Sequence, residues 1–198
     1  MSVALLVASL AKQLPQVNAD YIVGVDRGAL VCAKSGILMD LAIGDFDSVS
    51  TAELNMINTF SKEIIRLDAD KDVTDTQAAL SYVEDFDEVM ICGGLGGRID
   101  HQQINIGLVK KDIRLCLWDD HHLIYAVDGD KTIKKAGYRY LSLFACEEST
   151  VDLSGVKYPL SNRKINENDL YLVSNEISDE EAFIRVNGKV LIIQSNDA

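Results

Sequence analysis

The stretch Leu41-Ala-Ile-Gly-Asp-Phe-Asp-Ser48 decides the first half of the fold. Its apolar residues end at Gly44, and two carboxylates, Asp45 and Asp47, follow at once. Short apolar runs of this kind form the buried strands of parallel sheets, and ligands of open α/β sheets bind beyond the carboxyl ends of such strands. The stretch therefore predicts a buried strand with an acidic site at its end.

Similar apolar runs lie on both sides of this stretch, at residues 3–8, 20–25, 63–67, 87–92 and 113–118. The segments between them carry apolar residues at helical spacing, as in Leu54, Ile57 and Phe60. Strands that alternate with helices predict a parallel sheet with helices on both faces.

The chain changes character near residue 122, where short strands separated by turns replace the alternating pattern. Asn187-Gly188 lies between two β-rich runs and predicts a type I′ hairpin. We therefore expect an α/β domain over residues 1–121 and an all-β domain over residues 122–198.

The composition of the chain limits which kinds of molecule it can bind. The 198 residues carry 31 acidic and 19 basic side chains, a formal net charge of −12, and 47% are hydrophobic. This balance excludes a disordered chain and disfavours nucleic acid and anionic membranes as partners. No apolar run approaches the ~20 residues of a membrane-spanning helix, and the four cysteines form no C-x-x-C pair. We read the opening apolar run as a strand rather than a secretory signal, and expect a cytoplasmic protein with buried thiols.

The first acidic loop is Gly44-Asp-Phe-Asp-Ser48. In an extended segment residues two apart point to the same side, so both carboxylates would face one point. Like charges held close repel unless a cation lies between them, and Mg²⁺ prefers such hard oxygen ligands. The alternative is a simple turn before the next helix. Ser50 and Glu53 form a capping box for that helix, which accounts for Ser50 but not for the two aspartates.

The second acidic loop runs from Asp68 to Gln77. Thr74 followed by Gln77 predicts a helix start, with Asp75 in the first turn, where the helix dipole favours negative charge. The loop holds more aspartates than capping needs, and Lys71 among them can balance their charge or reach a phosphate. The alternative is a solvated acidic loop.

The third loop, Gly93-Gly-Leu-Gly-Gly-Arg-Ile-Asp-His101, follows a predicted strand and opens a helix. Glycines let the backbone approach phosphate, a helix N-terminus offers free N–H groups, and Arg98 adds a planar fork suited to phosphate oxygens. The spacing matches neither the Walker A motif nor the dinucleotide fingerprint. Asp100 with Gln103 can instead cap the helix, and His101 can be a packed or capping side chain.

The three loops follow strands of one predicted sheet, so they can converge on one edge of it. In that arrangement the acidic pair would hold a cation, and the cation would bring a polyphosphate to a protein that otherwise repels anions.

These motifs, in this order and spacing, resemble those of the thiamine pyrophosphokinase family: Gly44-Asp-Phe-Asp-Ser48, Lys71-Asp-Val-Thr-Asp75 and Gly96-Gly-Arg-Ile-Asp-His101. Val25-Asp-Arg-Gly-Ala29 resembles the family's upstream nucleotide loop. The β-rich half continues the resemblance through Ser142-Leu143, Gly155-Val-Lys-Tyr-Pro-Leu160 and Ser174-Asn175.

The resemblance implies an N-terminal Rossmann-like α/β domain for ATP and Mg²⁺ and a C-terminal β-sandwich that helps to hold thiamine. It implies a thiamine diphosphokinase, which transfers diphosphate from ATP to the hydroxyl of thiamine and yields thiamine diphosphate and AMP. It also implies a homodimer with its sites at the subunit interface.

Residue by residue, the resemblance assigns Mg²⁺ to Asp45, Asp47 and Asp75, with Asp72 as a further ligand. The nucleotide would be surrounded by Asp26, Arg27, Gly28, Ser48, Lys71, Thr74, Gly97 and Arg98. Asp100 would lie at the junction of the two substrates, as the candidate general base. Tyr158, Ser174 and Asn175 would line the thiamine pocket, although Tyr158 can also be a core aromatic and the other two a β-turn.

Two other functions fit parts of the sequence. An apolar run before D-x-D is also the nucleophile signature of haloacid-dehalogenase-like phosphatases, but here it is not at the first strand, and Asp119-Asp120 precedes the candidate Lys134. A binding protein without catalysis would retain the fold and bind ligand without turnover. Every acidic motif residue is present, which disfavours that second alternative.

Overall fold

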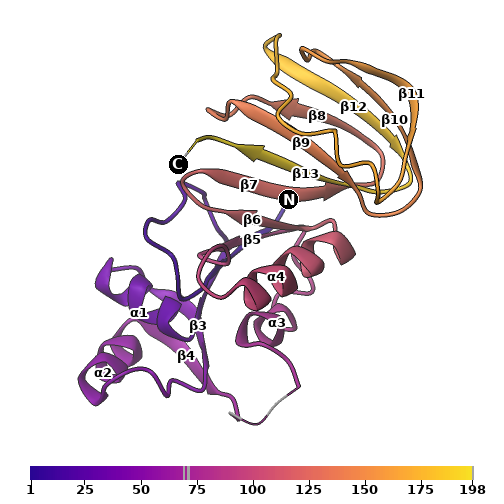
Figure 1. Ribbon diagram of the computed structural model, residues 1–198. Helices are drawn as coiled ribbons and strands as arrows, with labels where there is room; N and C mark the ends of the chain where they lie inside the picture. The colour runs from indigo at the N-terminus through magenta and orange to yellow at the C-terminus, as the bar shows by residue number, and fades with distance from the viewer. Residues whose placement is uncertain (69, 71, 198) are drawn as a thin grey trace. The chain divides into compact units, whose positions relative to one another are not determined.

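The computed structural model describes residues 1–68, 70 and 72–197 (Figure 1). The chain divides into two compact units. The first comprises Met1–Leu108 and Leu117–Asp119, and the second comprises Val109–Cys116 and Asp120–Ala198.

The first unit contains five strands that pair in parallel: β1 (Val3–Val7), β2 (Tyr21–Val25), β3 (Met39–Gly44), β4 (Ser61–Arg66) and β5 (Glu88–Cys92). Their spatial order is β4-β3-β2-β1-β5, and every neighbouring pair is parallel. The strands predicted for this part of the chain are confirmed, each within two residues at either end. The carboxyl ends of all five strands therefore lie along one edge, which is where the acidic and glycine-rich loops begin.

Four helices connect or follow these strands: α1 (Arg27–Lys34), α2 (Thr51–Thr59), α3 (Asp75–Leu80) and α4 (Ile99–Lys111). Two predicted helix starts are confirmed. Ser50 and Glu53 form the capping box of α2, and the Thr74 hydroxyl accepts a hydrogen bond from the Gln77 backbone N–H at the start of α3.

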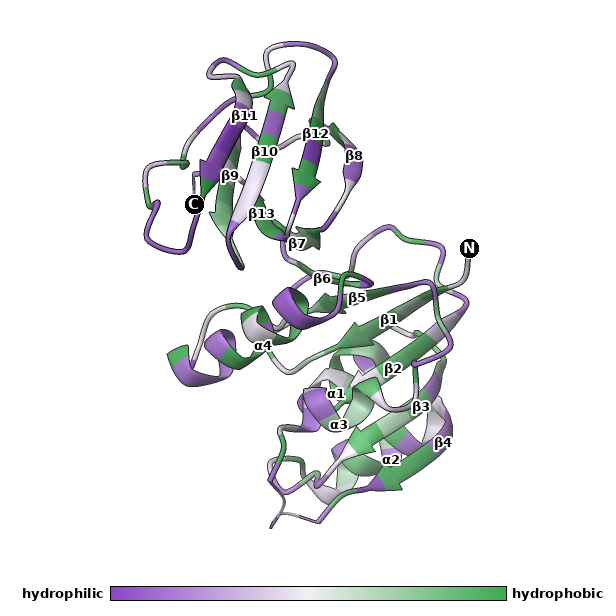
Figure 2. Cartoon of the chain, turned by 90° about the vertical axis from the view of Figure 1, so that its right-hand side faces the viewer, coloured by the Kyte–Doolittle hydropathy of each residue, from purple (hydrophilic) through white to green (hydrophobic). Residues whose placement is uncertain are grey.

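Both faces of the parallel sheet are buried. Leu5 and Val7 pack with α1 in one hydrophobic cluster. Ala4 and Leu6 alternate with them along β1, so they lie on its other face, and they are also fully buried. Figure 1 shows α1 and α2 on one side of the strands and α3 on the other, and the hydrophobic colour runs along β1, β2 and β3 in Figure 2. The prediction of a sheet with helices on both faces is confirmed.

The second unit is rich in strands: β7 (His122–Val127), β8 (Asp130–Lys134), β9 (Tyr140–Ala145), β10 (Ser149–Ser154), β11 (Leu160–Ile165), β12 (Glu181–Asn187) and β13 (Val190–Ser195). β13 pairs with β7 and β9, and a second sheet has the order β11-β10-β12-β8. The two sets share one core, to which Leu143, Ile192, Leu153 and Ile184 contribute. The remaining strand, β6 (Leu115–Trp118), has residues in both units.

The predicted hairpin at Asn187-Gly188 is wrong in its pairing. The turn exists, and Gly188 has a positive φ of 113°, but β12 pairs with β10 and β8 while β13 pairs with β7 and β9. The chain crosses here from one sheet to the other. Alternate residues of β12 are buried, and Ala182, Ile184 and Val186 on that face belong to the shared core. The local turn signal fixes where the chain bends, whereas core packing fixes which strands pair.

The fold thus has an α/β portion followed by a β-rich portion. In the part of the chain that the structure describes, no helix has the length and apolar character needed to cross a membrane.

Candidate functional site

Asp26 follows β2 in a strained backbone conformation. It precedes α1 with φ 49° and ψ −122°, and its side chain makes no capping hydrogen bond to that helix. Its Oδ2 atom accepts a hydrogen bond of 3.4 Å from the Ser9 hydroxyl, whereas its buried Oδ1 atom accepts none from the residues that the structure describes. A non-glycine residue with a positive φ and an unsatisfied buried oxygen is typical of a ligand-binding site.

The loop after β3 lies directly against Asp26. A Cβ atom at Gly44 would lie 2.9 Å from the Asp26 Cα, so only glycine permits this approach. The backbone N–H of Asp47 donates to Asp45 Oδ1 at 3.1 Å, and Phe46 between them has φ 56°. The loop is therefore a turn, and the expectation that an extended backbone aims both carboxylates to one side is wrong.

The loop after β4 carries the second set of predicted residues. Thr74 caps α3 and Asp75 lies half-buried in its first turn, while Asp72 is exposed. Lys71, which we predicted to contact the nucleotide, lies outside the described residues.

The electrostatics show that these loops converge. Burial raises the pKa of Asp26, and the adjacent Arg27 backbone N–H lowers it. Three more carboxylates raise it further, those of Asp45, Asp75 and Asp47. Three carboxylates from the loops after β3 and β4 therefore lie within electrostatic range of Asp26, at the end of β2.

The residues fit a magnesium ion by their donor chemistry. They offer hard carboxylate oxygens, and one of these is buried and unsatisfied. Among the described residues, no three His, Cys, Asp or Glu side chains are gathered closely enough to hold a metal by themselves. Mg²⁺ is usually bound by one or two carboxylates together with substrate phosphates and water, so this arrangement suits a metal that arrives with a nucleotide.

Arg27 and Gly28 shape the loop after β2. The Arg27 Nη1 atom donates to the Ser48 carbonyl at 2.8 Å and so ties the loop after β2 to the loop after β3. A Cβ atom at Gly28 would overlap the Val7 carbonyl, so this glycine allows α1 to begin against β1. In this arrangement Arg27 braces the acidic loops.

Residues 8–11, after β1, connect the acidic loops with the glycine-rich loop. Ser9 contacts Asp26, and the Leu10 backbone N–H donates to the Gly93 carbonyl at 3.4 Å. The Leu10 side chain also contacts the position that a Cβ at Gly97 would occupy. This segment was not predicted, because it carries no charge or glycine pattern in the sequence. The position of β1 between β2 and β5 in the sheet is the signal that indicates it.

The glycine-rich loop ends in an ion pair. Arg98 donates to Asp100 through Nε at 3.1 Å and through Nη2 at 2.5 Å. The hydrogen bonds from the Arg98 guanidinium lower the pKa of Asp100 to about 2. Asp100 is thus a weak proton acceptor while Arg98 holds it, and His101 beside it is exposed.

In the second unit, the structure brings Tyr158, Ser174 and Asn175 together. The Asn175 amide donates to the Tyr158 carbonyl at 2.9 Å and accepts from the Tyr158 backbone N–H at 3.0 Å. The Tyr158 ring is 61% exposed, so the alternative of a core aromatic is wrong. Ser174 is exposed with φ 58°. Asn175 therefore fixes the backbone that presents the Tyr158 ring to solvent.

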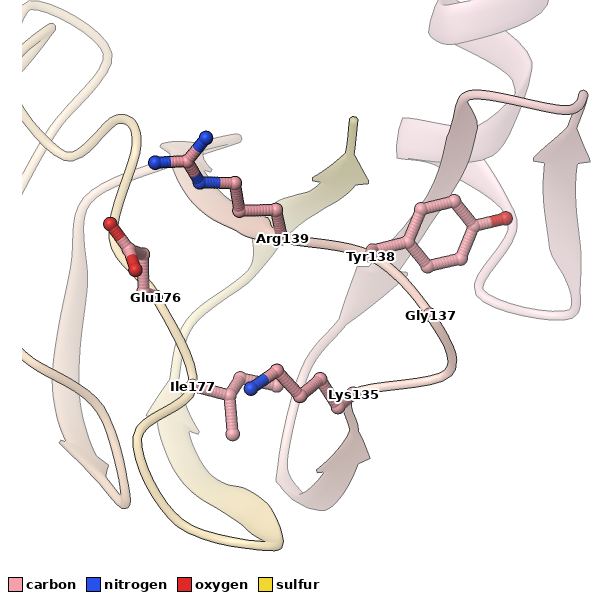
Figure 3. A pocket seen from close by; sticks show the side chains of 6 residues that line it. All are labelled: Lys135, Gly137, Tyr138, Arg139, Glu176 and Ile177. Atoms are coloured by element: carbon pink, nitrogen blue, oxygen red, sulfur yellow. The ribbon is translucent and has the colours of Figure 1, made fainter. Parts of the chain in front are cut away.

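A cavity of about 320 Å³ lies beside this group in the second unit. Figure 3 shows the loop Lys135–Arg139 on one side of it and Glu176 and Ile177 on the other. Its lining includes two basic side chains, Lys135 and Arg139, which suit a cationic ligand poorly.

Comparison with known proteins matches two successive parts of the chain to two family models. Residues 13–117 match the family model "Thiamin pyrophosphokinase, catalytic domain", and residues 130–191 match "Thiamin pyrophosphokinase, vitamin B1 binding domain". The first match includes all the acidic and glycine-rich loops, and the second includes Tyr158, Ser174 and Asn175.

Individual relatives give the same result. The chain is 33% identical over 186 residues to a thiamine pyrophosphokinase of Bacillus subtilis (strain 168), which covers 88% of this chain and 87% of the relative. Two solved structures cover the whole of both chains. A thiamine pyrophosphokinase from Bacillus subtilis has a TM-score of 0.88 at 27% identity, and a family protein from Enterococcus faecalis has 0.85 at 28%.

Proposed function

This chain belongs to the thiamine pyrophosphokinase family, and we propose that its first unit binds ATP with Mg²⁺ through the loops that follow β2, β3 and β4. It is a transferase that moves diphosphate from ATP to the hydroxyl of thiamine, giving thiamine diphosphate and AMP. One observation carries the assignment of the site: Asp26 is half-buried with an unsatisfied oxygen and within electrostatic range of three other carboxylates.

The acidic loops would hold the metal ion that offsets the charge of the polyphosphate. Asp45, Asp47 and Asp75 are the proposed ligands, with Asp72 as a further one, and the position of Asp26 adds a fourth carboxylate to the first three. Bound there, Mg²⁺ would offset charge on the transferred diphosphate and align it, which is most of what phosphoryl-type transfer requires. Ser48, Thr74, Lys71 and the backbone around Gly28 complete the proposed nucleotide environment.

The glycine-rich loop supplies the second half of the nucleotide site. Gly96 and Gly97 have φ values of 82° and 63°, which suit a backbone that bends around phosphate. Arg98 offers its fork to phosphate oxygens but is held by Asp100 in this structure. A phosphate that draws Arg98 away would let the pKa of Asp100 rise, so that Asp100 becomes a better acceptor for the proton of the attacking hydroxyl.

The second unit offers an aromatic face for thiamine. The exposed Tyr158 ring suits the cationic thiazolium, and Lys157 already lies over that ring, 5.5 Å from its centroid. A cationic substrate would take the place of Lys157, whose ammonium lies 3.7 Å from Glu176. Ser174 and Asn175 border the same surface.

Three finer points belong to the same proposal and rest on the family resemblance. The α/β portion is a Rossmann-like domain and the β-rich portion a β-sandwich. The protein is a homodimer with its sites at the subunit interface. It works in the cytoplasm.

The direct test incubates the protein with ATP, Mg²⁺ and thiamine and measures all products. Equal amounts of AMP and thiamine diphosphate, with loss of both in Asp45→Asn, support the proposal. Release of inorganic phosphate without thiamine diphosphate would instead support the phosphatase alternative, and binding without turnover would support a binding protein.

A further inference from the structure

The glycine-rich loop, residues 93–97, is held by two side chains of the helix that follows it. We propose that Asn105 and Gln102 are positioning residues, which keep this loop in the shape that receives the nucleotide phosphates. The inference rests on the proposed function, because it takes the loop as part of the nucleotide site. Neither residue is assigned a role by the motifs described above.

Asn105 is a buried polar side chain with one defined partner in the loop. It is 7% exposed, and its Nδ2 atom donates to the Gly94 carbonyl at 2.7 Å. The packing around Gly94 is close, since a Cβ atom there would lie 3.1 Å from that Nδ2 atom and 3.0 Å from Leu117 Cδ2. A buried amide is retained in a core only where its hydrogen bonds are made, so this contact fixes the Gly94 carbonyl.

Gln102 holds the other end of the loop with the opposite polarity. Its Oε1 atom accepts a hydrogen bond from the Gly96 backbone N–H at 2.9 Å. One side chain thus donates and the other accepts, three residues apart on one helix, and their bonds lie on either side of Leu95. α4 is a regular helix from Ile99, so it gives both side chains a firm base.

The loop needs such restraint because of its composition. Glycines populate many backbone conformations, and Gly93, Gly96 and Gly97 all have positive φ values here. A loop free to sample these conformations would have to be ordered each time a nucleotide binds, which weakens binding. Two hydrogen bonds from α4 select one conformation in advance, and they also set the backbone from which Arg98 projects.

The test uses matched substitutions with opposite expectations. Asn105→Asp keeps the shape but replaces the donor with an acceptor, so it should raise the KM for ATP about five- to tenfold and leave the KM for thiamine within about twofold. Gln102→Met removes the acceptor and should raise the KM for ATP by a few-fold. Gln102→Glu keeps the acceptor, so its KM for ATP should stay close to that of the wild type. Gln103→Glu adds the same charge to an exposed position of the same turn and serves as its control.

The outcomes separate this inference from the proposed function. If Arg98→Ala raises the KM for ATP but Asn105→Asp and Gln102→Met only lower the melting temperature, the two residues are structural and the inference is wrong. If Arg98→Ala itself leaves the KM for ATP unchanged, the glycine-rich loop is not part of the nucleotide site, and that part of the proposed function is wrong. Should Asn105→Asp fail to fold, the Gln102→Met and Gln102→Glu pair decides, since Gln102 is only partly buried.

Discussion

Replacing Asp26 with Asn should stabilise the protein and inactivate it at the same time. The wild-type carboxylate is half-buried among three others, and its pKa is raised by burial and by those neighbouring charges. Asn has nearly the same shape, retains an oxygen that can accept from Ser9, and carries no charge. The substitution therefore removes repulsion from the metal-free protein and, in the same step, removes a charge from the proposed metal site.

The expected gain in the free energy of unfolding depends on how many like charges surround Asp26. Two like charges near a protein surface repel by on the order of 1 kcal/mol once solvent and salt screen them. With three carboxylate neighbours and partial exposure, we expect a gain of about 1–2 kcal/mol in the free energy of unfolding, or roughly 2–8 °C in melting temperature for a chain of this size. Transfer should fall by about 10²–10³, as when one preorganised electrostatic group is lost from an active site.

The assay is thermal unfolding in EDTA and again in Mg²⁺ with ATP, beside steady-state turnover. A raised pKa of an acid means that the folded protein holds its proton more tightly than the unfolded chain. Stability in EDTA should therefore fall as pH rises from the ordinary aspartate pKa through the raised pKa of Asp26, and this fall should shrink in Asp26→Asn.

The control is Glu63→Gln, which removes one negative charge from an exposed position on β4 in the same unit. It should change neither turnover nor the response to Mg²⁺. An Asp26→Asn protein that is less stable in EDTA, yet turns over at the wild-type rate, would show that Asp26 neither suffers repulsion nor contributes to the metal site.

Three further predictions test other parts of the molecule. Asp45→Asn and Asp47→Asn should each abolish Mg²⁺-dependent turnover while far-UV circular dichroism stays unchanged; full activity in both would remove them from the metal site. Tyr158→Ala should raise the KM for thiamine far more than the KM for ATP, because the exposed ring is the proposed thiazolium contact, whereas equal changes would argue against stacking. Gly188→Ala should lower the free energy of unfolding by about 1–3 kcal/mol in a denaturant titration, since its φ is 113° and a Cβ would overlap the Ser149 hydroxyl; an unchanged midpoint would count against that close packing.

Local signals in the sequence predicted much of the first unit. Apolar runs bounded by glycine and polar residues gave the strands, and Ser50 with Glu53 and Thr74 with Gln77 gave two helix starts, because caps act within one turn. The pairing of β12 and β13 could not be predicted in this way. A turn at Gly188 is compatible with several sheets, and the shared core chooses among them.

The residues of the candidate site could also be predicted only where a local motif marks them. Motifs indicated Asp45, Asp47 and Asp75, but the place of Asp26 among them depends on β2 lying beside β3 and on the bare backbone of Gly44. Its left-handed conformation leaves no mark in the residue type. Asn105 was missed for a related reason, because a buried amide on a helix resembles any other packed side chain until its partner is known.

We propose that the acidic loops bind the nucleotide only through a divalent cation. Calorimetric titration of ATP into the protein, with Mg²⁺ and again with EDTA, tests it most directly. We expect clear binding with Mg²⁺, little or none in EDTA, and loss of the Mg²⁺-dependent binding in the Asp45→Asn, Asp47→Asn double variant. ATP that binds equally well in EDTA, or a double variant that binds as the wild type does, would contradict it.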